Sequence, residues 1–255
     1  MEFLASIGRA FLGFLVATGR FTIFTVTAIS HCVRPPLYPR LILRQMIDVG
    51  YYSLPVVGLT AIFTGMVLAL QTNTGFSRFS AQGAVATVVL LSMTRELGPV
   101  IAALMVAGRI GAAIAAEIGT MRVTDQIDAL ATLSTNPFKY LVVPRIVAGV
   151  VTLPVLVLVA DIIGVFGGFL VATYKLGFNP AGYIGQTADN LRSDDIVSGL
   201  VKAAVFGFIV TIMGCYFGYN SRGGAQGVGA ATTYAVVSAS ILVLLVDYLL
   251  TSVLL

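Results

Sequence analysis

Long uncharged runs are the feature of this chain that most restricts its fold. They lie between Asp48 and Arg78, between Arg145 and Asp161, between Lys202 and Arg222, and between Arg222 and Asp247. A helix needs about 20 mainly apolar residues to cross the hydrocarbon core of a bilayer. Hydrophobic residues make up 58% of the 255 positions and charged residues 10%, whereas a soluble domain is about a quarter charged. The sequence therefore predicts an all-α polytopic membrane protein.

Five transmembrane helices are expected once the interrupted apolar stretch from Ala81 to Ala116 is included. Their predicted ranges are 50–72, 82–116, 141–174, 196–218 and 232–254. Five spans place the chain ends on opposite sides, and Lys and Arg favour cytoplasmic loops. Basic residues gather before the first span and in the link at 117–140, so both are predicted to be cytoplasmic. This bias accounts for the net charge of +4 without a nucleic-acid partner.

Residues 1–40 are predicted to form an interfacial amphipathic helix and linker ahead of a five-helix domain at 41–255. On a helix, Glu2, Arg9 and Arg20 fall within about 40° of one another. One polar stripe on an apolar helix favours a position in the membrane interface. The alternative is a sixth span, in which the two arginines snorkel to the interface and the N-terminus lies outside.

Charged residues interrupt several apolar runs, namely Arg95, Glu96, Asp161, Lys202 and Asp247. Each costs about 2.5 to 3.5 kcal/mol on insertion scales if it is unpaired, so these side chains are expected to face protein or water. Neighbouring helix positions point about 100° apart, so Arg95 and Glu96 are expected to reach different helices. Lys202 is the expected partner of Glu96, and Asp247 that of Arg95. Pro99 leaves the carbonyl of Arg95 without its helical donor, so the second span is expected to break there.

These charges allow two interpretations. They form either a polar cluster near mid-membrane that responds to substrate, or static ion pairs that hold the helices in register. Asp161 has no evident partner in its own helix.

The first span is expected to end outward in QTNTGFSRFS, residues 71–80. Arg78 can pair with a phosphate, and Phe76 and Phe79 can flank acyl chains. The alternative is an ordinary polar loop with interfacial aromatic residues.

Motifs for nucleotide binding and covalent catalysis are lacking. The glycine-rich segment RGGAQGVG at 222–229 is not followed by Gly-Lys-Ser/Thr, and the chain has no Walker A sequence or Ser-His-Asp set. His31 and Cys32 do not make a metal site, because two ligands without a second pair are too few. A disulfide between Cys32 and Cys215 is not expected, since both lie near cytoplasmic membrane ends in the predicted topology. We expect no bound cofactor, no metal and no enzymatic activity in this chain.

The cytoplasmic segment EIGTMRVTDQIDALATLSTNPFK, residues 117–139, alternates apolar and charged positions. It therefore predicts a short amphipathic helix that docks onto a soluble partner. Such an arrangement is similar to the coupling helices by which permeases of ABC transporters rest on their ATPases.

The segment RELGPVIAALMVAGRIGAAIAAEIGTMRVTDQIDAL at 95–130 is followed by Asn136-Pro137 and by VVPRIVAGVVTLP at 142–154. Together they resemble the MlaE/YrbE permease family of maintenance-of-lipid-asymmetry ABC transporters. The likeness runs from GMVLALQ at Gly65 to the region of Asp247, whereas the first 40 residues match only in character.

The resemblance implies a homodimeric permease in the bacterial inner membrane, with its N-terminus in the cytoplasm and a lipid pocket between the two subunits. The implied partners are a cytoplasmic ABC ATPase that binds ATP and Mg, a STAS-domain protein and a periplasmic ring of MCE-domain protein. The implied substrate is phospholipid moved between the inner and outer membranes.

Three sets of residues match functional positions of that family. The lipid-pocket candidates are Leu68, Leu70, Gln71, Phe76, Arg78 and Phe79. The intramembrane charges are Arg95, Glu96, Lys202 and Asp247. The positions expected to couple to the ATPase are Glu117, Met121, Arg122, Asp125, Ile127, Asp128 and Leu130. An alternative function is a proton-coupled secondary transporter, with Asp161, Glu96 and Asp247 as a titratable relay. A structural membrane anchor is a third possibility.

Overall fold

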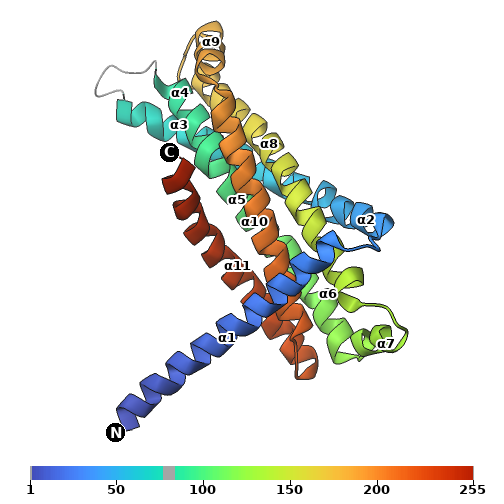
Figure 1. Cartoon of the computed structure of the whole chain (residues 1–255). Coiled ribbons are helices and arrows are strands. Elements are labelled where there is room, and N and C mark those ends of the chain that lie inside the picture. The colour runs from blue at the N-terminus through green and yellow to red at the C-terminus, as the bar shows by residue number, and fades with distance from the viewer. Residues whose placement is uncertain (1, 77–83, 255) are drawn as a thin grey trace.

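A computed structural model describes residues 2–76 and 84–254 of the chain, and every regular element in them is a helix (Figure 1). The predicted all-α class is confirmed. The helices are α1 (Glu2–Val33), α2 (Pro39–Val49), η1 (Tyr51–Ser53), α3 (Leu54–Phe76), α4 (Val85–Ser92), η4 (Met93–Leu97), α5 (Gly98–Val106), η5 (Ala107–Gly111), α6 (Ala112–Val123), α7 (Gln126–Thr132), η6 (Phe138–Val142), α8 (Val143–Tyr174), α9 (Pro180–Asn190), α10 (Ser193–Tyr219) and α11 (Gly224–Leu254).

Six helical stretches in the described residues are long and apolar enough to cross a membrane. They are Phe11–Val33, Pro39–Phe76, Val85–Val123, Phe138–Tyr174, Ser193–Tyr219 and Gly224–Val253. The last five correspond to the predicted spans, and each is longer than its predicted range. The first of these five is extended by α2, which leads through η1 into α3. The second is extended because α6 continues past the predicted end at Ala116, and the fifth because α11 begins at Gly224.

The additional stretch belongs to α1, which projects away from the bundle toward its N-terminal end (Figure 1). Its C-terminal half packs on the bundle, where the ring of Phe24 lies 5.1 Å from that of Phe138 and 5.4 Å from that of Tyr216. Of the three predicted polar positions, Arg20 is exposed, and the side chains of Glu2 and Arg9 lie outside the described part of the chain. The interfacial and spanning predictions for this helix both stay open.

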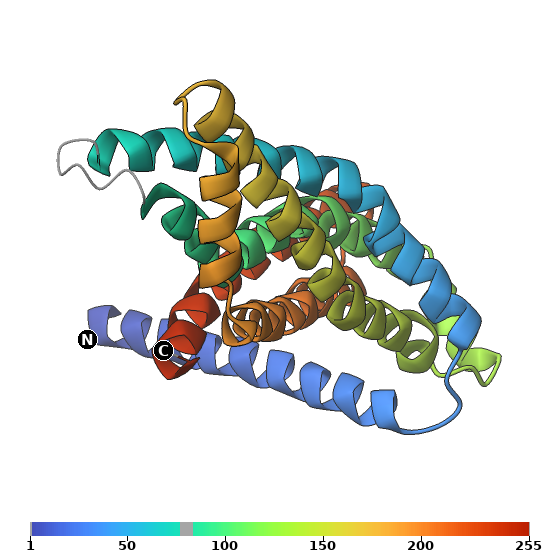
Figure 2. The ribbon, with the colours of Figure 1, turned by 90° about the horizontal axis from the view of Figure 1, so that it is seen from above.

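The bundle has two ends, one carrying α7 and the other carrying α9, which we call the α7 end and the α9 end (Figure 1). Between them, α8 packs against α3 and α10, and α10 packs against α6 and α11. Figure 2 shows the same bundle from above, with α1 along one edge. On the predicted topology, the α7 end is cytoplasmic and the α9 end faces outward.

Glycines allow the central helices to approach closely. A Cβ at Gly65 would overlap the carbonyl of Gly164, and a Cβ at Gly207 would overlap that of Gly149. Such backbone contacts are how helices associate tightly where lipid removes the hydrophobic driving force. These two crossings fix α8 against α3 and α10.

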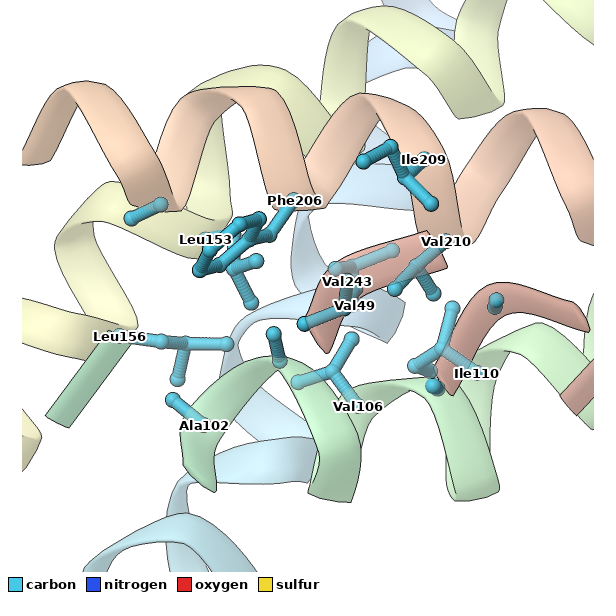
Figure 3. Packing of buried hydrophobic residues seen from close by; sticks show 14 of the residues in the cluster. Val49, Ala102, Val106, Ile110, Leu153, Leu156, Phe206, Ile209, Val210 and Val243 are labelled. Carbon is cyan, nitrogen blue, oxygen red and sulfur yellow. The ribbon is translucent and has the colours of Figure 1, made fainter. Parts of the chain in front are cut away.

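Aliphatic and aromatic side chains fill the space between these helices (Figure 3). Val106 from α5, Leu153 from α8, Phe206 from α10 and Val243 from α11 are all almost completely buried in one cluster. Since protein interiors are packed at crystal-like density, this cluster holds the helices in one register.

Two local predictions differ from the structure. The segment at 117–139 was expected to be one helix, but α6 ends at Val123 and α7 starts at Gln126. Asp125 between them has a φ of 57°, a left-handed conformation that interrupts a helix. The helix α9 was also not predicted, although Asn179 followed by Pro180 is a helix-start signal. The side chain of Asn179 accepts a hydrogen bond of 3.0 Å from the backbone N–H of Ala181.

Candidate functional site

Charged side chains from η4, α10 and α11 meet around one buried ammonium group. Lys202 Nζ lies 2.7 Å from Glu96 Oε2 and 3.2 Å from Asp247 Oδ1, and it donates a 2.7 Å hydrogen bond to Thr251 Oγ1. The side chain of Lys202 is only 1% exposed. A buried charge is tolerated only when it is paired and hydrogen-bonded, and here two carboxylates compensate one cation.

The backbone of η4 takes part in the same network. Lys202 Nζ donates a 3.0 Å hydrogen bond to the carbonyl of Arg95, which lacks its α-helical donor because Pro99 has no N–H. The residues from Met93 to Leu97 form a π-helical turn in place of an α-helical one. The second span therefore continues through this π-helical turn instead of breaking as predicted, and Lys202 provides a donor to the carbonyl that the proline releases.

The predicted pair of Glu96 and Lys202 is confirmed, but the predicted pair of Arg95 and Asp247 is wrong. Arg95 instead binds Asp195 in the first turn of α10, with its Nη2 2.6 Å and its Nε 2.7 Å from Asp195 Oδ1. Arg95 and Glu96 do diverge as expected, and Asp247 is then drawn to Lys202. Asp195 was missed because acidic residues are common in the first turn of a helix, where they interact with its dipole.

The cluster lies closer to the α9 end than the mid-membrane position that we predicted. Lys202 is in the third turn of α10 counted from Ser193, and Thr251 is close to the end of α11. A small cavity of about 110 Å³ adjoins the cluster. Its lining comprises Arg95, Glu96, Asp194, Asp195, Ser198, Lys202 and Thr251.

A larger cavity, of about 550 Å³, lies along one face of α3; we call it the α3 cavity. Its lining comprises Leu59, Thr60, Phe63, Thr64, Val67, Leu68, Gln71 and Leu97. Two predicted pocket residues, Leu68 and Gln71, are among them. Leu70 and Phe76 are not in this lining, and Arg78 and Phe79 lie outside the described residues.

The chemistry of the α3 cavity suits an apolar chain with a polar end. Leu59, Phe63 and Val67 recur every four residues, so they form one stripe, and each is more than half exposed. The hydroxyl of Thr64 donates to its own helix, which leaves its oxygen free to accept. Leu97 belongs to η4, the turn that also carries Arg95 and Glu96, so the α3 cavity reaches the element that contributes to the charge cluster.

At the α7 end, the structure divides the predicted coupling residues into two groups. Ile127 is 1% exposed and belongs to the core cluster, and Met121 and Leu130 pack against that cluster. The interpretation of Ile127 as a contact with an ATPase is therefore wrong, because its side chain points into its own subunit. Asp125 is exposed, and Asp128 is 62% exposed and forms a 2.7 Å ion pair with Arg122.

Two further residues at this end were missed. Leu133 follows α7 and is 75% exposed, so it presents an apolar contact that the amphipathic pattern did not single out. Arg145 at the start of α8 is 4% exposed and forms a 2.7 Å ion pair with Glu117 of α6. Glu117, which we expected to face the ATPase, therefore also ties α6 to α8.

One family model and several known proteins are similar to this chain over most of its length. A family model described as permease MlaE matches residues 42–253. A probable ABC transporter permease protein of Rickettsia felis is 59% identical over 246 residues, which cover 96% of this chain and 95% of the relative. The intermembrane phospholipid transport system permease protein MlaE of Haemophilus influenzae is 35% identical over 254 residues, which cover 99% and 97%. The chloroplastic protein TRIGALACTOSYLDIACYLGLYCEROL 1 of Arabidopsis thaliana is 38% identical over 210 residues, which cover 82% of this chain and 60% of the relative.

Proposed function

Since the chain belongs to the MlaE permease family, we propose that it is the membrane subunit of an ABC transporter that moves phospholipids between the inner and outer membranes. The observation that carries this proposal is the α3 cavity, an apolar volume lined by α3 and by Leu97 of η4, the turn that also contributes Glu96 to the charge cluster around Lys202. Acyl chains lie along the apolar stripe, and the head group lies toward the α9 end. A cavity of about 550 Å³ is within the usual range for small-molecule sites.

The transporter contains two copies of this chain. In one copy the α3 cavity is open along its exposed stripe, and the fully buried apolar side chains of α11 lie on one narrow face, at Ala231, Ala235, Ala239 and Val243. A second copy placed against α3 and α11 closes the α3 cavity into a pocket between subunits. Small residues on the packed face of α11 are typical of helices that associate within a bilayer.

The conformational change that drives transport starts at the α7 end. A cytoplasmic ATPase holds α7 through exposed groups such as Asp128 and Leu133, and ATP and Mg bind in that ATPase. Because α6 continues without a loop through η5, α5 and η4 to Glu96, a displacement of α7 is carried along the second span to the charge cluster. Closure of the ATPase pair then narrows the α3 cavity and expels lipid toward the α9 end.

Further partners complete the assembly. A STAS-domain protein accompanies the ATPase, and a ring of MCE-domain protein on the periplasmic side receives lipid. The permease lies in the bacterial inner membrane, with its N-terminus in the cytoplasm. The Haemophilus relative, which carries the name of an intermembrane phospholipid transport permease, supports this substrate.

The proton-coupled alternative is not supported by the arrangement of its proposed relay. Glu96 and Asp247 both contact Lys202 or its hydrogen-bonding partner. Asp161 lines a different cavity and has no hydrogen-bond or ion-pair partner among the described residues. A relay needs a chain of connected groups, and within the described part of the chain no contact links Asp161 to the other two.

Purification of the tagged protein from its native membrane in mild detergent tests the proposal. Mass spectrometry of the co-purifying proteins and lipids should identify an ABC ATPase, an MCE-domain protein and phospholipid, and the complex should hydrolyse ATP. Purification of the permease without any ATPase, together with no ATP hydrolysis, would contradict the proposal.

A further inference from the structure

A second cavity, of about 330 Å³, lies away from the α3 cavity, between α4, η4, α8, α9 and α10; we call it the Asp161 cavity. Its lining comprises Leu90, Thr94, Leu158, Asp161, Ile162, Val165, Thr187, Leu191, Ile196 and Leu200. It shares no lining residue with the α3 cavity or with the cavity beside the charge cluster. Leu158, Ile162 and Leu191 are 42%, 63% and 45% exposed, so the Asp161 cavity opens toward the surroundings of the bundle.

Among the described residues of this lining, Asp161 is the single charged one. Its Oδ1 is buried against the backbone of Gly98, where a side chain would overlap it, and it has no hydrogen-bond partner. By contrast, Arg95, Glu96, Lys202 and Asp247 are paired with one another or with Asp195. A carboxylate inside a span that has no cation is costly, so such a residue marks a site where the missing charge comes from a ligand.

The remaining polar groups of the Asp161 cavity narrow the chemistry of that ligand. The hydroxyl of Thr94 donates to the carbonyl of Leu90 at 3.0 Å, and the hydroxyl of Thr187 donates to the carbonyl of Tyr183 at 2.9 Å. Both hydroxyl hydrogens are used within their helices, so the two oxygens can only accept. The described side-chain lining therefore offers acceptors and no cationic donor.

A cavity with one carboxylate and two hydroxyl oxygens that can only accept hydrogen bonds is unsuited to most membrane ligands. A phosphate or carboxylate placed beside Asp161 would find no donor among these side chains and would be repelled by its charge, so only the ammonium end of a zwitterionic head group fits there. A divalent cation prefers six or more oxygen ligands in the case of calcium, and octahedral coordination in the case of magnesium. A primary ammonium carries three N–H donors and one positive charge, which match the acceptors and the carboxylate of this cavity.

We propose that the Asp161 cavity is a second ligand site, which binds the primary ammonium group of a membrane amphiphile and packs its apolar part against Leu158, Ile162 and Leu191. The amphiphile enters from the bilayer through the exposed mouth of the cavity. Two sources supply this chemistry, a two-chain lipid with an ethanolamine head group and a single-chain amine. The site does not depend on which lipid the α3 cavity carries.

The chain contains no tryptophan, which makes a fluorescence test direct. Ile162→Trp places one reporter at the mouth of the Asp161 cavity, and Val151→Trp places one at an exposed position on the same helix but outside the cavity. Each variant is reconstituted in bilayers of phosphatidylcholine that contain brominated phosphatidylethanolamine, brominated phosphatidylcholine or dibrominated octadecylamine as the quencher.

We expect brominated phosphatidylethanolamine to quench the Ile162→Trp variant with a relative binding constant about tenfold above that of brominated phosphatidylcholine, because the choline group has no N–H to donate. Adding Asp161→Asn, which keeps the size of the side chain but removes its charge, should abolish this preference. The Val151→Trp variant should show none. A preference for dibrominated octadecylamine alone would identify a single-chain amine as the ligand.

Two results would overturn the proposal. One is equal quenching of the Ile162→Trp variant by all three probes. The other is a preference for an ammonium probe that persists in the Asp161→Asn background.

Discussion

Removal of the Lys202 ammonium should destabilise the permease far more than removal of either carboxylate that it binds. Lys202 is 1% exposed and contacts both Glu96 and Asp247, whereas Glu96 is 36% exposed. In Lys202→Met, two carboxylates are left facing each other without a cation. Removal of one member of a buried ion pair costs about 3 to 5 kcal/mol.

The variant Glu96→Gln leaves a much smaller defect. Lys202 keeps Asp247, Thr251 and the carbonyl of Arg95, and partial exposure of Glu96 lets water replace part of the lost interaction. We expect a loss of about 1 kcal/mol, close to that of a partly exposed ion pair.

A triple variant separates stability from function. Glu96→Gln, Lys202→Met and Asp247→Asn together leave no uncompensated charge, and replacing a buried ionic cluster by neutral groups is often nearly neutral for stability. If the charges respond to substrate, this variant should be as stable as wild type in thermal unfolding but should transport lipid slowly. Normal transport by a stable triple variant would make the charges static ion pairs.

Thermal unfolding of the purified permease, followed by loss of monodispersity on heating, measures these differences. The predicted order of melting temperatures places Lys202→Met well below Glu96→Gln, with the triple variant near wild type. Equal melting temperatures for Lys202→Met and Glu96→Gln would refute the assignment of Lys202 as the centre of the cluster.

The remaining predictions concern the α7 end, the helix crossings and the α3 cavity. Ile127→Asp should lower the melting temperature of the permease itself because the side chain is buried, whereas Leu133→Asp should leave folding intact and weaken co-elution with the ATPase in gel filtration; normal co-elution of the latter would exclude that contact. Gly65→Ala should destabilise by a few kcal/mol because the methyl group meets the carbonyl of Gly164, and Gly229→Ala, where nothing lies within 4 Å of an added Cβ, is the control in the same thermal assay. Val67→Trp should fill the α3 cavity and reduce the phospholipid that mass spectrometry finds bound to the purified protein, and unchanged lipid content would place the lipid elsewhere.

Much of the fold follows from hydropathy because a bilayer allows few alternatives. A run of about 20 apolar residues in lipid must satisfy its own backbone hydrogen bonds, which a helix does. The ends of the membrane-spanning helices were harder to predict, because α2 and α6 extend beyond the hydrophobic runs as polar or mixed segments that pack on other parts of the protein. The helix α9 was missed because it is short and lies in the connection between α8 and α10, where its capping residue is the main signal.

The site was predicted less completely than the fold. The pairing of Glu96 with Lys202 follows from the small number of charges available in the spans. The partner of Arg95 could not be predicted in this way, because Asp195 has the sequence context of an ordinary acidic residue at the start of a helix. The burial of Ile127 also could not be predicted, since an amphipathic pattern does not say whether its apolar face covers the same subunit or a partner.

Lipid release from proteoliposomes tests the central claim most directly. The permease is reconstituted with its co-purified ATPase and with labelled phospholipid, and the transfer of label to the co-purified MCE-domain protein is followed. The account predicts transfer that requires ATP and is abolished by a variant of the ATPase that cannot hydrolyse it. Transfer that proceeds equally without ATP and follows an imposed pH gradient would contradict the account and favour a proton-coupled transporter.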